Sequence, residues 1–134
     1  MAESDQTPAP QGNVPDKAFF VAANDHVELS NRQARHQGTQ KIGLASLYGA
    51  ARFNAHAYLE SVPAVEAPQR RGEFLDYMGT MFRRMLNEHL DQLGDERGID
   101  VGESELAEVY AANGVQRRRA GGDAAPPQAP VAGE

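Results

Sequence analysis

Apolar residues recur every three or four positions along most of the chain, which is the spacing of amphipathic helices. The first such segment predicts a helix from about Asp16, an N-cap residue directly after Pro15, to about Arg35. Gly38 then marks the end of this helix, and Thr39 is the expected N-cap of the next one. The apolar stripe of the first helix consists of Phe20, Ala23, Val27 and Ala34.

The second predicted helix, from about Gln40 to Glu60, is apolar on nearly every side. Its main stripe contains Leu44, Leu47, Tyr48, Ala51, Ala55, Tyr58 and Leu59. The opposite face is also apolar or small, with Ile42, Ser46, Gly49, Phe53 and Ala57. A helix of this kind must be covered on two sides. The pattern therefore predicts that this segment is the central helix of the fold.

A third helix is predicted from Pro68, which suits a first helical turn, to Leu93, with Gly94 as its stop. His89 lies near the middle of the inner face of this helix. The apolar residues of that face are Leu75, Met78, Phe82, Met85, Leu86, Leu90 and Leu93.

A short fourth helix is predicted from about Glu103 to Asn113, and Gly114 ends it. Its inward residues are Leu106, Val109 and Tyr110. No segment has a convincing strand pattern. The fold class is therefore predicted to be all-α, as a small helical bundle of three long helices plus one short C-terminal helix.

The chain of 134 residues is long enough for one ordinary domain. Both of its ends lack large apolar residues in a regular pattern and are rich in proline, alanine and glycine or in small polar residues. Residues 1–15 and 117–134 are therefore predicted to be disordered tails. The helical bundle domain is predicted to span residues 16–116.

The charge and the cysteine content exclude several classes of function. A net charge of −6 argues against a nucleic-acid-binding surface, which needs a basic field. The chain has no cysteine, so disulfides, thiolate metal sites and cysteine nucleophiles are ruled out. No targeting signal or membrane-spanning run is visible. These features predict a soluble cytoplasmic protein that binds neither nucleic acid nor membrane.

The four histidines do not stand in a metal-binding pattern. A carboxylate-bridged di-metal bundle needs a Glu three residues before a His on the same helix. The residues at those positions are Ala23, Gln33, Phe53 and Leu86. No H-E-x-x-H motif, calcium loop, phosphate-binding G-x-x-x-x-G-K loop or G-x-S-x-G elbow occurs. The sequence therefore indicates no catalytic residue, no metal ligand set and no cofactor.

Five polar residues stand on or beside predicted apolar faces, and they are the candidate binding residues: Asn24, Asn31, Arg52, Asn54 and His89. Two interpretations apply to them. Buried polar groups are usually hydrogen-bonded and structural, and a buried neutral imidazole is an ordinary core feature. A polar ligand pocket inside the bundle is the alternative.

The second face of the central helix supplies the interface candidates Ile42, Gly49, Phe53 and Ala57. A continuous apolar strip left exposed there would be unusual for a monomer. The fourth predicted helix could fold back over this strip, or an identical face of another copy could pack on it. We favour the fourth helix, because it is amphipathic and itself needs a surface.

Three sequence strings resemble a family of proteins. They are AFFVAANDHVELSNRQ from Ala18, YGAARFNA from Tyr48 and YMGTMFRRMLNEHLDQ from Tyr77. Together they resemble a small uncharacterised proteobacterial domain-of-unknown-function family, of the DUF 3144 type, over about Ala18 to Gln92. The A-A-R-F-N-A string is the most specific part. The resemblance implies a small, soluble, helical bacterial protein and no assigned activity.

Two functions from different classes follow from these observations. The favoured one is a non-enzymatic protein-interaction module that binds an unidentified protein partner or itself. The alternative is a small-ligand-binding or catalytic bundle that uses the polar Asn, Arg and His cluster. A cleft among those residues would favour the second, and a filled core would favour the first.

Overall fold

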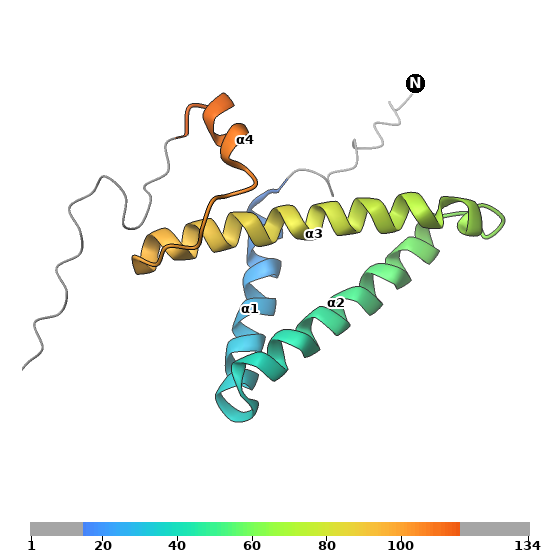
Figure 1. Cartoon of the computed structure of the whole chain (residues 1–134). Helices are drawn as coiled ribbons and strands as arrows, with labels where there is room; N and C mark the ends of the chain where they lie inside the picture. Colours follow the sequence, from blue (N-terminus) through green and yellow to red (C-terminus); the bar gives the residue numbers. More distant parts are fainter. Residues whose placement is uncertain (1–14, 116–134) are drawn as a thin grey trace, which may run out of the picture. The chain divides into compact units, whose positions relative to one another are not determined.

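The computed structural model describes residues 15–115, and within them it contains four helices and no strand (Figure 1). The helices are α1 (Lys17–Gln37), α2 (Thr39–Ser61), α3 (Ala67–Arg97) and α4 (Ala107–Ala112). The prediction of an all-α fold with three long helices and one short one is confirmed. The predicted tails lie outside the described residues, apart from Pro15.

The helices belong to two compact units that divide between Pro63 and Ala64. The first unit holds α1 and α2, and the second holds α3 and α4. A single bundle domain over residues 16–116 stays a prediction. None of the helices within residues 15–115 combines the length and the apolar content needed to cross a membrane.

Both ends of α1 follow from local capping chemistry. The Asp16 side chain accepts a hydrogen bond from the Phe19 amide at 2.8 Å, as expected of an N-cap. At the other end, the Gly38 amide donates to the Ala34 carbonyl at 2.8 Å, and Gly38 has a φ of +92°. Glycine adopts such a φ readily because it has no Cβ. Gly38 thus joins α1 to α2 as a single-residue turn.

Thr39 is the first residue of α2 and not its N-cap, which corrects the prediction. The Gly38 carbonyl already accepts a hydrogen bond from the Ile42 amide at 3.2 Å. The helical ladder therefore begins at Gly38, and Thr39 lies inside the first turn.

The large apolar side chain that the α1–α2 hairpin buries lies near its turn. Ile42, one turn into α2, is 4% exposed, and no other large apolar side chain of the hairpin is buried. Ser30 and Ala34, near the end of α1, are half-buried. Away from the turn the two helices diverge (Figure 1). Most large apolar side chains that follow Ile42 along α2 are consequently exposed, and Tyr58 is half-buried.

α3 begins with Pro68 in its first turn, as predicted, but it does not end at Gly94. It continues to Arg97, and Gly98 is the stop, with a φ of +65° in the left-handed region. Gly94 instead lies buried inside the helix. A Cβ there would lie 2.7 Å from Val101 Cγ1 and 3.0 Å from the Ile99 carbonyl oxygen. The glycine is required because the following chain returns across it.

The segment after Gly98 folds back along α3 and then forms α4. α4 is shorter than predicted and begins at Ala107, because residues 103–104 are irregular and residues 105–106 form a turn. In that turn the Ser104 carbonyl accepts from the Ala107 amide at 3.3 Å, and the Ser104 hydroxyl accepts from the Leu106 amide at 3.0 Å. Leu106 is buried. Gly114, with a φ of +69°, follows the helix end as predicted.

Gly94→Ala is expected to lower the free energy of unfolding of the second unit by about 1–2 kcal/mol, because the added methyl group overlaps Val101 and Ile99. Gly79→Ala is the matched control, since Gly79 also lies inside α3 and nothing is within 4 Å of its Cβ position. The control should gain about 0.5–1 kcal/mol from helix propensity. Urea unfolding followed by circular dichroism measures both. Equal effects of the two substitutions would contradict the close approach.

Candidate functional site

The structure places four of the five predicted binding residues on the hairpin, Asn24 and Asn31 on α1 and Arg52 and Asn54 on α2. Two of them form hydrogen bonds within their own helix. Asn24 Nδ2 donates to Glu28 Oε1 at 3.1 Å, and Asn54 Nδ2 donates to the Ala50 carbonyl at 2.8 Å. Asn24, Asn31 and Arg52 are exposed, and Asn54 is half-buried. The ligand-pocket interpretation stays a prediction.

The fifth residue, His89, lies on α3 in the second unit and is exposed. The expectation of a core histidine is therefore wrong. The returning chain is bonded to a different face of α3, which carries Arg83, Asn87 and Asp91 at intervals of four residues. The apolar stripe that contains His89 is not the face that this chain uses.

The interface candidates on α2 differ sharply in exposure. Ile42 is 4% exposed, whereas Phe53, on the same helix face, is 68% exposed. Ala57 is exposed, and nothing lies within 4 Å of the position that a Cβ on Gly49 would take. We call Ile42, Gly49, Phe53 and Ala57 the α2 face. The α2 face is buried near the turn, at Ile42, and exposed farther along α2, at Phe53 and Ala57.

A buried carboxylate on α3 ties the C-terminal segment to the helix. Asp91 is 4% exposed, and its Oδ2 accepts hydrogen bonds from Ser104 Oγ at 2.5 Å and from Tyr110 Oη at 2.8 Å. A buried carboxylate is stable only when hydrogen bonds replace its lost hydration. The two hydroxyl groups, one before α4 and one within it, supply such bonds. Asp91 therefore fixes the position of α4 on α3.

A second polar cluster lies one and two turns earlier on α3. Arg83 binds the Glu105 carboxylate with two nitrogens, Nε donating to Oε1 at 2.7 Å and Nη2 donating to Oε2. Asn87 Nδ2 also donates to Glu105 Oε1, at 3.0 Å, and Asn87 Oδ1 accepts from the Glu105 amide at 3.1 Å. The cluster holds the turn before α4 by both backbone and side chain.

These hydrogen bonds change the acidity of Glu105. The bond from Arg83 is the main reason why the pKa of Glu105 is lowered from 4.5 to about 2, and the bond from Asn87 adds to it. The same ion pair raises the pKa of Arg83 above its usual value. Both side chains are largely exposed to solvent, so salt will screen the attraction.

Asp91, Arg83 and Asn87 are not among the residues that the sequence pattern predicts as functional. The signal present in the sequence is their spacing of four residues, which puts three hydrogen-bonding groups on one face of a helix, with the small Gly94 on the same side. Such a polar stripe ordinarily faces solvent. Only the positions of Ser104, Glu105 and Tyr110, which depend on how the chain turns after Gly98, reveal that this stripe binds the returning chain.

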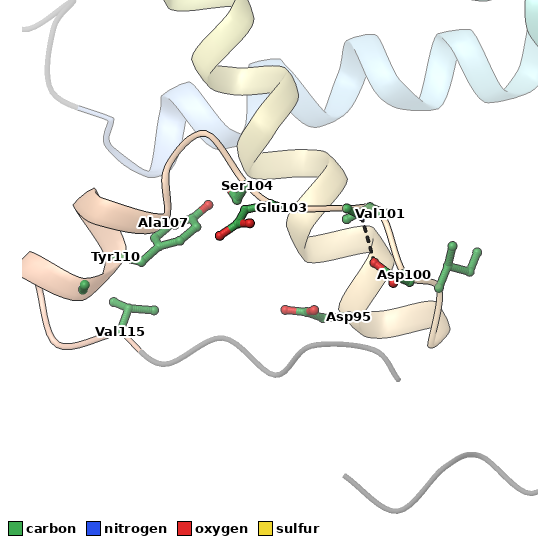
Figure 2. Close-up of a pocket in the computed structure, with 11 residues that line it drawn as sticks. Asp95, Asp100, Val101, Glu103, Ser104, Ala107, Tyr110 and Val115 are labelled. Atoms are coloured by element: carbon green, nitrogen blue, oxygen red, sulfur yellow. Dashed lines mark hydrogen bonds between the residues drawn. The ribbon is translucent and has the colours of Figure 1, made fainter. Parts of the chain in front are cut away.

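A cavity of about 200 Å³ lies between the end of α3, the returning loop and α4 (Figure 2). Its acidic lining comes from Asp95, Asp100 and Glu103. Asp100 Oδ1 accepts from the Gly102 amide at 2.9 Å, which shapes the loop (dashed line in Figure 2). No group of three His, Asp or Glu residues within residues 15–115 is arranged to hold a metal ion.

A family model described as "Protein of unknown function (DUF3144)" matches residues 19–93. The chain belongs to this family. The DUF3144 region covers most of α1, all of α2, and α3 as far as Leu93. It includes the α2 face and Asp91, whereas Ser104, Glu105 and Tyr110 lie after it. Neither a search of curated proteins nor one of solved structures gave a match.

The Glu105 contacts predict a dependence of stability on acidity. Because the folded-state pKa is depressed, the ionised Glu105 stabilises the fold above a pH of about 4.5, and this contribution is lost as the pH falls from about 4.5 to about 2. The comparison is with Glu105→Gln, which cannot ionise. Urea unfolding at a series of pH values should show the advantage of the natural chain shrinking over that window. A difference that stays constant down to a pH of about 2 would contradict the assigned contacts.

Proposed function

We propose that this protein is a non-enzymatic interaction module that binds a protein partner through the α2 face. The observation that carries the proposal is the change along that face, from buried Ile42 at the turn to Phe53 at 68% exposure. Burying a phenylalanine side chain fully contributes about 1.5–3 kcal/mol. Phe53 is thus an available anchor for a partner.

The rest of the hairpin supports an apolar contact of useful size. Large apolar side chains are exposed along both helices: Phe19, Phe20, Val21, Val27, Leu29, Leu44, Leu47, Tyr48, Phe53 and Leu59. A monomeric soluble protein rarely leaves so many of them in one region without a binding role. An aromatic anchor with smaller apolar neighbours is the usual centre of a protein interface.

The chemistry of the α2 face favours association over catalysis. Its residues are Ile42, Gly49, Phe53 and Ala57, and none of them carries a nucleophile or an acid–base group. The stretch from Ile42 to Ala51 contains no charged residue. A partner surface can therefore cover it without removing a charge from water. The proposal also places the protein in the bacterial cytoplasm, and the absence of cysteine suits that reducing compartment.

Site-specific photo-cross-linking tests the function directly. A photoreactive benzophenone side chain is introduced in place of Phe53 in the full chain, and the cells that produce it are irradiated. We expect a covalent adduct with a protein, detected by mass. The matched control carries the same group in place of Asp25, which is exposed on α1. Adducts at neither position, or equal adducts at both, would contradict a binding role for the α2 face.

A further inference from the structure

We propose that the partner of the α2 face is a second copy of this chain, with the two α2 helices packed antiparallel. This inference rests on the proposed function, because it names the occupant of the same surface. Four observations carry it: the engagement of α4, the open space at Gly49, the charges at the two ends of α2, and the exposed apolar area.

The short helix α4 is already engaged within its own unit. Leu106, the residue before α4, is buried, and the Tyr110 hydroxyl donates a hydrogen bond to Asp91 on α3. These are two of the three residues that the sequence offers as a cover for the α2 face. Both residues thus make their contacts within the second unit. Of the two covers that the sequence suggests for the α2 face, this favours an identical face from another copy over α4.

The α2 face is complementary to itself in shape. In an antiparallel pair related by a two-fold axis, each residue i lies level with a residue j, and the pairing is reciprocal. A register that sets Phe53 level with Gly49 of the second copy places two aromatic rings over two open glycine positions. Glycine inside a helix is destabilising relative to alanine, and close approach of a partner is one reason for its presence.

The same register is complementary in charge. Lys41 of one copy then lies within one residue, or about 1.5 Å along the axis, of Glu60 of the other. Both residues are exposed, and between them the chain consists of the uncharged stretch Ile42–Ala51 and a following segment whose one Lys, Arg, Asp or Glu residue is Arg52. A parallel pair would instead place like charges opposite each other. The distribution of charge along α2 thus selects the antiparallel arrangement.

Two exposed aromatic side chains supply about a third of the area that a standard dimer interface buries on each copy. Phe20 on α1 is 61% exposed and Phe53 is 68% exposed. A fully covered aromatic side chain buries about 150–250 Å². With their exposed fractions, Phe20 and Phe53 together could bury about 200–300 Å² per copy. A standard interface buries about 800 Å² on each partner. In the proposed dimer, further area comes from exposed residues of the two helices: Val27, Ala57 and the stems of Lys41 and Glu60.

Charge reversal in the full-length chain tests both the partner and the register. Lys41→Glu and Glu60→Lys, each alone, are expected to raise the dimer dissociation constant about tenfold, measured by analytical ultracentrifugation over a dilution series. The double variant Lys41→Glu/Glu60→Lys is expected to return to within about twofold of the natural chain. Lys41 and Glu60 are nineteen residues apart, about 28 Å along one helix, so they cannot pair within a single α2. Rescue therefore requires two antiparallel copies.

Two apolar variants complete the test. Phe53→Glu is expected to raise the dissociation constant at least about 100-fold with the helical circular dichroism unchanged. Val65→Glu is the matched control, because Val65 is exposed and lies in the loop after α2, and its dissociation constant should not change. A chain that is monomeric at every concentration, or a double variant as weak as the single ones, would overturn the proposal.

The cross-linking experiment separates this failure from a failure of the proposed function. An adduct at position 53 with twice the mass of the chain supports the second copy. An adduct of another mass overturns the second copy but leaves an interaction role for the α2 face. No adduct at that position contradicts both.

Discussion

Apolar side chains lower the free energy of a fold only where something covers them, and a hairpin of two helices has little to cover them with. In the first unit the single-residue turn at Gly38 brings the helices together at one end, and Ile42 is the apolar side chain that this contact buries. Because α1 and α2 diverge from there, Phe20 and Phe53 stay exposed. Two such hairpins, with two helices each, would together supply the four helices of a four-helix bundle.

The second unit is held together in a different way. Its C-terminal segment is fixed on α3 chiefly by polar groups, with Asp91 buried under two hydroxyls and Glu105 bound by Arg83 and Asn87. A network of this kind specifies geometry strictly, because a misplaced partner would leave a carboxylate without hydrogen bonds. Its α3 residues belong to the DUF3144 region, whereas their partners follow that region. The C-terminal segment is thus fixed on residues that lie inside the matched region.

Local chemistry predicted the helix ends where a single residue decides them. Asp16 caps α1 and Gly38 ends it, because a carboxylate next to free amides and a residue without a Cβ act within one turn. The stop at Gly94 was wrong because Gly94 and Gly98 are equally suitable by sequence, and the returning chain decides between them. Periodicity identified the apolar stripe of α3 but not the face that the following chain would use. For this reason His89 is exposed and Asp91 is buried.

We propose that another protein surface, namely a second copy of the chain, covers the α2 face. Hydrogen–deuterium exchange of the full chain over a thousandfold range of protein concentration measures this association. Association stabilises the bound form by mass action, so the amides around Gly49 and Phe53 should exchange more slowly as the concentration rises. The amides around Leu106, which is buried within one chain, should not change. If the amides around Gly49 and Phe53 exchange at the same rate at every concentration, the proposed association is wrong.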